Sequence, residues 1–351
     1  MNILKTITHN KLALASLVVL GVLYTMALFA PFFAPYHYDD DDVLTVYAPP
    51  SQIHLIDGNN RVSPPFVYRR NVSLNEYYQR VYVEDTMKSC PVKLFVRGSR
   101  YKLFGLFESD IHFFGAPGTK VFLCGADSRG RDIFSRILYG AQVSLSIGIV
   151  GALLSLGIGM VVGGIAGYAG GSVDNALMRL CEVIMCVPAF YLMLALRAAF
   201  PPYLRSLEVY LLIVVILSLI GWASIARIIR GLSLSLRERE FVYAARASGL
   251  SHVAIITRHI LPHTFSYVLA AFFLSIPGYI GAEAALSLLG LGIQEPQASW
   301  GNLLSSALGI VNIRLSPWIL TPGIFILVTV VCFNVVGDAL RDALDPKRKI
   351  L

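Results

Sequence analysis

Two acid–base pairs with helical spacing are the first group of residues that could do chemistry. Asp127 and Arg131 stand four residues apart with the acid first, and so do Asp132 and Arg136. This spacing places each pair on one helix face, so it predicts an amphipathic interfacial helix with Asp127 as its N-cap. The alternative is a site that holds a charged substrate, which would require these side chains to face a cavity.

A single acid within an apolar run, Glu283, is the second candidate. A carboxylate inside a bilayer is costly, so this side chain should face the interior of a helix bundle or a watery cavity. A proton relay would need ionisable partners, and the nearest candidates, Arg197 and Arg179, belong to another apolar segment. A structural hydrogen bond is the favoured interpretation, and a role in a transport pathway is the alternative.

A basic segment, residues 237–263, separates two strongly apolar segments and is the third candidate. The sequence predicts two short helices there, over residues 240–248 and 251–260. Gly249 breaks the first helix and Pro262 ends the second. A helical pair of this kind on the face of a membrane protein suggests a docking site for a soluble partner.

Common catalytic and metal-binding motifs are absent from the sequence. It has no P-loop, no His-Glu-x-x-His motif and no useful Ser/His/Asp grouping, so the chain is not expected to hydrolyse a nucleotide. The five cysteines lack metal-ligand spacing. Cys90 and Cys124 share one polar loop and could form a disulfide if that loop is extracytoplasmic. The other three lie in apolar segments, where they act as small hydrophobes: Cys181, Cys186 and Cys332.

The composition is that of an integral membrane protein. Of the 351 residues, 56% are hydrophobic and only 15% are charged, and the mean hydropathy is +0.64. A soluble domain would carry about a quarter of its residues as charges. The net charge of +7 does not indicate nucleic-acid binding, because the basic residues cluster at the ends of apolar segments and in loops.

Six segments are apolar enough to cross the membrane, since a spanning helix needs about 20 such residues. The first is expected to be a retained span and not a cleaved signal peptide, because no small-residue cleavage site follows it. The expected spans are residues 12–33, 142–169, 176–200, 209–228, 265–293 and 318–339.

The basic residues predict the orientation. Six arginines and two glutamates lie in residues 227–258, after the fourth span. An even number of spans places this segment on the same side as both termini, which is therefore expected to be cytoplasmic. Both termini carry basic residues: Lys5, Lys11, Arg341, Lys347, Arg348 and Lys349.

The long loop after the first span is then external. Short β-like runs occur at residues 66–68, 93–96 and 121–123, so we expect a small ordered subdomain. The acidic run at residues 39–42 could bind a cation, but a solvated turn is favoured.

Small residues recur at every fourth position of the second span, which lets another helix backbone approach closely. Helix packing is favoured over the lining of a pathway. These residues are Ser155, Gly159, Gly163, Gly167 and Gly171.

The motifs together resemble those of ABC importer permeases. Residues 243–249 and 258–262 resemble the cytoplasmic Glu-Ala-Ala loop of that family. Three further regions resemble C-type subunits of oligopeptide/dipeptide permeases, and the resemblance covers the chain except for roughly residues 57–120. These regions are residues 124–145, residues 286–301 and residues 317–346.

The resemblance implies an all-α integral membrane protein of the type I ABC importer permease fold, with six transmembrane helices and an enlarged extracytoplasmic loop subdomain of mixed or β character. We expect the N-terminal tail and first span at residues 1–34 and the loop subdomain at 35–136. The permease core follows at 137–340, with a cytoplasmic coupling loop at 229–264, and a cytoplasmic tail occupies 341–351.

The resemblance also implies partners in the bacterial cytoplasmic (inner) membrane. A homologous B-type permease subunit would complete the translocation path, and an extracytoplasmic solute-binding protein would deliver substrate. Two cytoplasmic ABC ATPase subunits would use ATP and Mg, while this chain would bind no cofactor. The residues expected to contact an ATPase are Glu240, Tyr243, Ala244, Ala245, Gly249, Leu261 and Pro262.

Two features depart from the family pattern. Tyr243 stands where the family loop begins with glutamate, and our hypothesis is that Glu240, one helical turn earlier, supplies the acidic contact. The external loop is longer than in the simplest members, so its role cannot be taken from the family. The expected function is import of oligopeptides or dipeptides. The alternatives are nickel complexes or oligosaccharides as substrates, or a stand-alone secondary transporter.

Overall fold

The computed structural model describes residues 10–56, 62–76, 80–201 and 204–344. Lys5, Lys347, Arg348 and Lys349, which contributed to the expected orientation, lie outside these ranges. The chain divides into two compact units. The first comprises Met1–Gly21, Leu145–Leu286 and Leu327–Leu351, and the second comprises Val22–Ser144 and Ser287–Ile326.

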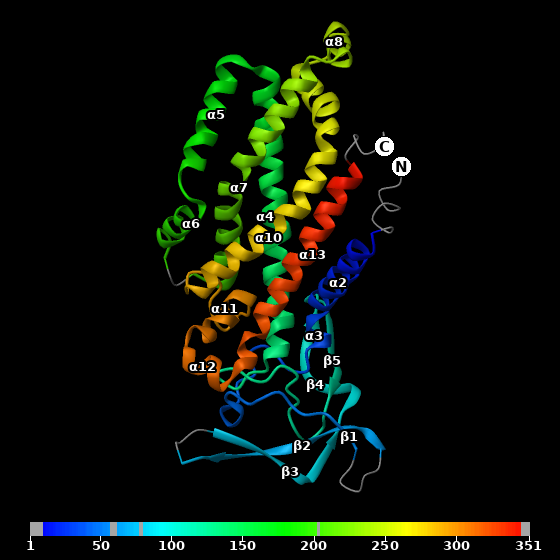
Figure 1. Ribbon diagram of the computed structural model, residues 1–351, viewed down its shortest axis with the longest axis vertical. Coiled ribbons are helices and arrows are strands. Elements are labelled where there is room, and N and C mark those ends of the chain that lie inside the picture. Colours follow the sequence, from blue (N-terminus) through cyan, green and yellow to red (C-terminus); the bar gives the residue numbers. More distant parts are fainter. Residues whose placement is uncertain (1–9, 57–61, 77–79, 202–203, 345–351) are drawn as a thin grey trace. The chain divides into compact units, whose positions relative to one another are not determined.

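Within the described ranges, five helical segments are long and apolar enough to cross a membrane, or six if one bent pair of helices is a single span. The expected helical membrane protein is thereby confirmed (Figure 1). The five segments are α2 (Lys11–Leu28), α4 (Ile133–Ala169), α7 (Ser206–Arg237), His252–Leu288 with α10 (Phe265–Leu288), and Pro317–Leu344 with α13 (Thr321–Leu344).

The third expected span is not one straight helix. It consists of α5 (Gly171–Cys186) and α6 (Ala189–Ala198), which are bent by 85° relative to each other. Pro188 at the break lacks a backbone N–H, and a proline pushes the residue before it out of the helical region. Val187 accordingly has the extended angles φ −85° and ψ 125°.

The small-residue face of α4 packs against α7. A Cβ atom on Gly159 would lie 2.7 Å from Cγ2 of Ile225, and one on Gly163 would meet the carbonyl oxygen of Ala226. The two helix backbones therefore touch over several turns, as the four-residue spacing predicts. Arg230 of α7 also donates two hydrogen bonds of 2.6 Å to Asp174 of α5.

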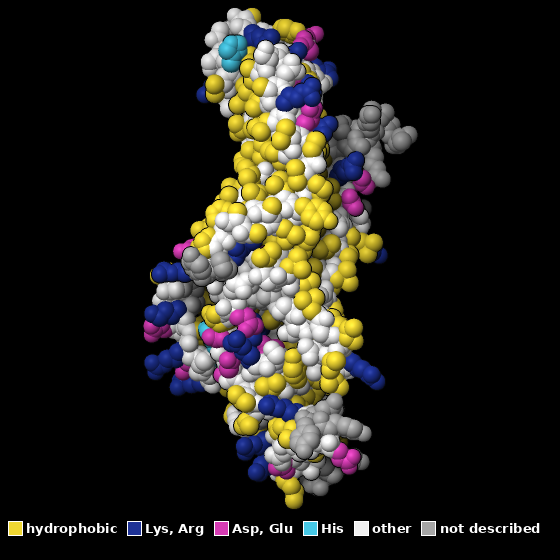
Figure 2. Space-filling view, turned by 90° about the vertical axis from the view of Figure 1, so that its left-hand side faces the viewer, with side chains coloured by type: hydrophobic (Ala, Val, Ile, Leu, Met, Phe, Trp, Pro, Cys, Tyr) yellow, Lys and Arg dark blue, Asp and Glu magenta, His cyan; other side chains and the backbone are white. Residues whose placement is uncertain are grey.

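The N-terminal half of α7 presents apolar side chains to the surface. Leu211, Val215 and Leu219 stand four residues apart and are each exposed. Figure 2 shows hydrophobic side chains spread over the surface of the helices. An exposed apolar face of this kind suits contact with lipid or with another membrane subunit.

The second unit contains the strands, which confirms the expected β character of the long loop. β1 (His54–Ile56), β2 (Val62–Leu74) and β3 (Arg80–Pro91) form an antiparallel sheet in the order β1-β2-β3. β4 (Lys93–Leu103) and β5 (Phe107–Gly115) form a separate hairpin. The predicted strand at residues 121–123 is wrong, because this segment has no strand structure although Val121 and Phe122 are buried.

Short helices complete the second unit. α3 (Ala30–Phe33) follows α2 directly, and a 3-10 turn occupies Val43–Thr45. Before α13 lie α11 (Trp300–Leu304), α12 (Ile310–Leu315), and 3-10 turns at Ser305–Leu308 and Pro317–Leu320. All five cysteines are free thiols, so Cys90 and Cys124 form no disulfide in this structure.

Candidate functional site

The basic segment 237–263 folds as two helices joined at Gly249. α8 spans Glu240–Ala247, and α9 (His252–Ile255) begins after Ser251, whose hydroxyl accepts a hydrogen bond from the backbone N–H of Ala254. Gly249 has φ +76°, which a residue without a Cβ atom adopts at little cost. The glycine break and the serine cap are therefore the local signals that divide this segment.

The predicted end of the second helix at Pro262 is wrong. A π turn (Ile256–Ile260) and a 3-10 turn (Leu261–Thr264) continue α9 directly into α10. Pro262 has no N–H to donate, and it lies where the π turn gives way to the 3-10 turn. The proline thus changes the pitch of the helix without stopping it.

One side of the helical pair is buried in its own unit. Val242 and Ala245 of α8 form an apolar cluster with Ile255, Ile260 and Tyr168, the last from the end of α4. The burial of these apolar side chains away from water is the main source of stability for a surface helix. The position of the loop is consequently set by α4 and by its own core.

Tyr168 is a functional candidate that the sequence did not reveal. Its hydroxyl lies 2.9 Å from Nδ1 of His252 in α9. The guanidinium of Arg246 in α8 lies 4.9 Å from the centre of its ring, within the range of a cation–π interaction. Tyr168 therefore contacts both helices of the loop.

The other side of the helical pair is an exposed surface of mixed character. Phe241, Tyr243, Leu250 and Val253 are exposed, and Val253 is 70% accessible. Several charged residues are exposed between them, including Arg239, Glu240 and Arg246. A surface of this composition, with apolar side chains rimmed by charges, is typical of a protein–protein contact.

The acid that contacts Tyr243 is Glu238. The tyrosine hydroxyl donates a hydrogen bond of 2.6 Å to this carboxylate, and Arg237 donates another of 2.9 Å. These two bonds hold the pKa of Glu238 below its usual value, with the tyrosine contributing more. The same contact raises the pKa of Tyr243. A negative charge is thus held beside Tyr243. The hypothesis that Glu240 compensates for the missing glutamate stays a prediction.

The predicted contact residues divide by exposure. Ala245 is buried in the apolar cluster, and Leu261 is half-buried, with its side chain close to Gly164 of α4. The buried parts of these two residues hold the loop in place. The remaining five are exposed and available to a partner: Glu240, Tyr243, Ala244, Gly249 and Pro262.

The predicted helix over residues 127–136 is wrong in its first half. α4 begins only at Ile133, and Asp127 to Asp132 form a tight turn. Asp127 accepts hydrogen bonds from the backbone N–H groups of Arg129 and Arg131, and Asp132 takes the capping role through the N–H of Ser135. Short polar side chains that bond to nearby backbone compete with the helix in this way.

The charged side chains of this turn are buried, which an interfacial helix would not have required. Asp127 accepts hydrogen bonds from Arg131 at 2.8 Å and from Arg136 at 2.9 Å, and Arg131 also donates to Glu295 at 2.7 Å. The expected pairing of Asp132 with Arg136 is replaced by the Asp127–Arg136 pair. Buried charges need such partners. We therefore interpret this cluster as a structural brace that holds the turn in place.

The acidic run at residues 39–42 pairs with the same region. Lys120 lies 3.0 Å from Asp40 and 3.5 Å from Asp42, and Arg131 lies 3.6 Å from Asp41. In the ranges that the structure describes, no three His, Cys, Asp or Glu side chains are grouped so as to hold a metal ion. The four acids are therefore held by bases of the loop.

Glu283 is fully buried in α10, as a carboxylate in a membrane span should be. Of its two suggested partners, Arg197 is buried in α6, and Arg179 is exposed on α5, where it bonds to Glu182 at 2.9 Å. The burial of Glu283 fits both the structural interpretation and the pathway interpretation.

Family models match most of the chain. Residues 159–350 match the family described as binding-protein-dependent transport system inner membrane component. Residues 2–50 match the N-terminal TM domain of oligopeptide transport permease C.

Two permease sequences from other bacteria agree with these matches. The oligopeptide transport system permease protein OppC of Haemophilus influenzae is 34% identical over 340 residues, which is 97% of this chain and 86% of that protein. The dipeptide transport system permease protein DppC of Bacillus subtilis is 40% identical over 225 residues, or 64% of this chain and 68% of that protein. The inward-facing MetNI methionine ABC transporter aligns with 61% of this chain and 98% of its own at 18% identity, with a TM-score of 0.45.

Proposed function

The chain belongs to the family of binding-protein-dependent transport system inner membrane components, as an oligopeptide/dipeptide ABC permease of the C type, and from this membership we propose that it forms half of a translocation path for oligopeptides or dipeptides. It is a transport subunit with the type I ABC importer permease fold. The other half of the path would come from a homologous B-type permease subunit. An extracytoplasmic solute-binding protein would deliver the peptide.

The exposed side of α8 and α9 is the observation that carries the proposal. It presents exposed apolar side chains, including Tyr243 and Val253, while the other side of the two helices is buried against Tyr168. A partner that pushes on this surface would move α4 and α10 with it, because the loop is packed on one helix and continuous with the other. This is the geometry needed to pass the motion of an ATPase to the membrane spans.

The energy would come from two cytoplasmic ATPase subunits that bind ATP and Mg. The sequence of this chain has no P-loop, so its own contribution would be mechanical. This assignment places the loop 229–264 and both termini in the cytoplasm and the subdomain at residues 35–136 outside it. The basic residues of the loop support this orientation.

The test is co-purification of the ATPase subunits with a tagged form of this chain. Val253→Asp places a charge at the most exposed of the four apolar side chains of this surface, and we expect at least about a fivefold loss of bound ATPase, equivalent to about 1 kcal/mol or more. Met87→Asp is the matched control, since Met87 is 91% exposed on β3, and it should leave ATPase binding unchanged. Full ATPase binding by Val253→Asp would contradict the proposal.

Charge reversal separates the two acids beside Tyr243. If Glu240 supplies the acidic contact to the ATPase, Glu240→Lys should weaken co-purification more than Glu238→Lys does. If the acid held by Tyr243 makes this contact, the order should be reversed. Equal binding by both variants and the unmodified chain would show that neither acid touches the ATPase.

A further inference from the structure

The β4–β5 hairpin carries an unusual number of exposed apolar side chains. Leu106 is 79% exposed and Phe107 is 67% exposed, and Phe104 at the same turn is also exposed. Further along the hairpin, Leu94 and Phe95 are exposed as well. Contiguous exposed apolar residues on a hairpin are unfavourable in water, so they indicate a surface that something apolar covers.

Ring contacts place this hairpin beside the end of the first membrane span. The ring of Phe104 at the turn lies 5.7 Å from that of Phe29, where α2 passes into α3. Phe95 and Phe113, further from the turn, lie 6.3 and 5.9 Å from Phe32 near the end of α3. The hairpin therefore runs along α3, with its turn beside the end of α2 (Figure 1).

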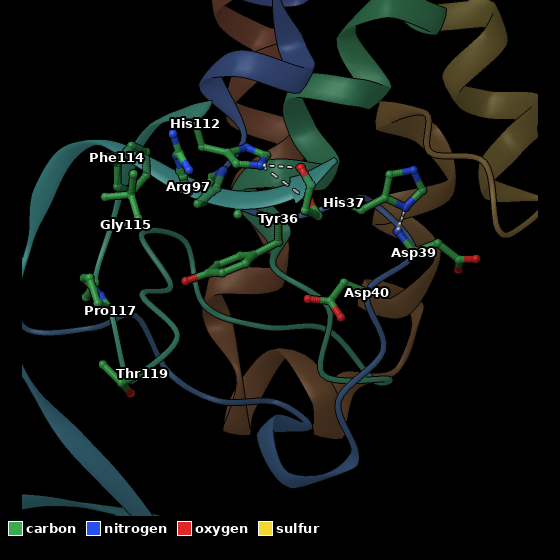
Figure 3. A pocket seen from close by; sticks show the side chains of 15 residues that line it. Tyr36, His37, Asp39, Asp40, Arg97, His112, Phe114, Gly115, Pro117 and Thr119 are labelled. Atoms are coloured by element: carbon green, nitrogen blue, oxygen red, sulfur yellow. Dashed lines mark hydrogen bonds between the residues drawn. The ribbon is translucent and has the colours of Figure 1, made fainter. Parts of the chain in front are cut away.

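A buried histidine fixes the base of the hairpin in this position. His112 is 2% exposed, and its Nδ1 lies 2.6 Å from the carbonyl oxygen of Ala34, just beyond α3. Its Nε2 lies 3.0 Å from the carbonyl oxygen of Ser99 on β4. Figure 3 shows His112 and its bond to Ser99 among the residues that line a pocket of about 720 Å³. The hairpin is thus attached to the end of the span and cannot swing away from it without breaking these contacts.

Charged residues mark where the apolar turn ends. Lys102 and Glu108 face each other across the hairpin at 3.1 Å, directly before the hairpin tip, which comprises the turn at residues 104–106 and the adjoining Phe107, and both are exposed. Lys93, Arg97 and Arg100 are exposed on the rest of β4. An apolar end followed by basic residues with long apolar stems is the pattern of segments that enter the boundary between lipid headgroups and acyl chains.

We propose that the hairpin tip, residues 104–107, inserts into the bilayer beside the first span and anchors the β subdomain to the membrane surface. Phe104, Leu106 and Phe107 would lie among the acyl chains near Phe29. Arg100 and Lys102, the exposed basic residues of β4 nearest the turn, would lie at the level of the lipid phosphates. Lipid is the occupant that the contacts favour, because the apolar turn continues the lipid-facing surface of a membrane-spanning helix.

The depth of the turn can be measured with the full-length chain in lipid nanodiscs. The variant Leu106→Trp carries a fourth tryptophan, since the unmodified chain has three. The fluorescence of the added tryptophan is the difference between the spectra of the variant and the unmodified chain. In nanodiscs of brominated phosphatidylcholine, we expect this added emission to fall at least about twofold relative to ordinary phosphatidylcholine, since the turn reaches the acyl chains. Met87→Trp on β3 is the matched control and should be quenched by aqueous iodide only.

Two results would overturn the proposal. One is an added emission at position 106 that iodide quenches as strongly as at position 87 and that brominated lipid does not change. The other is protection from iodide that appears only when the solute-binding protein is added, which would make the turn a protein contact. Phe107→Trp, measured in the same way, decides the matter if Leu106→Trp does not fold.

Discussion

The hydroxyl of Tyr168 lies 2.9 Å from Nδ1 of His252, so the last turns of α4 are bonded to the first residue of α9. Arg246 of α8 lies over the same aromatic ring. A single side chain at the end of a membrane span therefore contacts both helices of the proposed ATPase-binding loop. Displacement of the loop cannot leave α4 unaffected.

Tyr168→Phe should weaken this link without changing the packing of the ring. We expect the loss of one hydrogen bond to lower the free energy of unfolding by roughly 0.5–1.5 kcal/mol. Because the loop is held less firmly, peptide uptake per ATP hydrolysed should fall. Thermal unfolding in detergent and uptake by proteoliposomes of the assembled transporter provide the two measurements. Tyr191→Phe on α6, where the side chain is exposed, should change neither.

Gly249→Ala should destabilise the loop through its backbone. A Cβ atom at this position meets nothing within 4 Å, but the residue has φ +76°, which costs an L-amino acid about 1–2 kcal/mol. The expected result is weaker ATPase co-purification, with partial recovery in Gly249→Asn because asparagine tolerates this conformation better. Gly231→Ala in α7 is the control, since it is equally unobstructed and lies in a regular helix. If both alanine variants behave alike, the left-handed turn has no special role.

Arg131→Met should be strongly destabilising. It removes the hydrogen bonds to Asp127 and Glu295, and breaking a buried ion pair typically costs about 3–5 kcal/mol. Arg129→Met nearby removes a half-exposed arginine whose contacts to Asp41 and Glu295 are longer, at 3.8 and 3.3 Å, and should cost about 1 kcal/mol or less. Thermal midpoints of the two purified variants measure the difference. Equal midpoints would show that the cluster is not a brace.

Asp132→Asn should change how stability depends on pH. Burial raises the pKa of Asp132 to about 7, and among the described residues its Oδ1 has no hydrogen-bond partner. An unfolded aspartate has a pKa of about 3.9. Between about pH 4 and pH 7 the folded chain therefore binds a proton that the unfolded chain releases, so this group makes folding less favourable as the pH rises.

Asparagine cannot ionise, and its side-chain oxygen can still accept the hydrogen bond from the N–H of Ser135. The variant should lose less stability than the unmodified chain between pH 5 and pH 8, as measured by unfolding midpoints across that range. Glu108→Gln, at an exposed site on β5, should leave the slope unchanged. An unaltered slope in Asp132→Asn would mean that this carboxyl does not titrate in that window.

The spans and the helical loop could be predicted from sequence because their signals are local. Apolar length, the four-residue spacing of Gly159 and Gly163, and the glycine at position 249 each act within a few turns of one helix. The bend in the third span also had a local signal in Pro188. Proline is tolerated in membrane helices, so that signal did not decide between a continuous span and a broken one.

The turn at residues 127–132 shows where local signals fail. The spacing of Asp127 and Arg131 suits a helix, but Gly130 has φ +78°, and a Cβ atom there would collide with the carbonyl oxygen of Asp42. The partner that stabilises Arg131, Glu295, lies 164 residues away in the sequence. Tyr168 was missed for the same reason, since its partner His252 is 84 residues distant.

The helical path from α9 through Pro262 into α10 makes the loop one end of a lever. It runs from His252 to Leu288 over 37 residues, with Pro277 inside α10, and Val253 lies about 35 Å from the buried Ile276 just before this proline at 1.5 Å per residue. A tilt of about 5° around this buried end would carry the exposed end through about 3 Å. A small rotation deep in the helical unit and a larger displacement at a protein surface would therefore be the same movement.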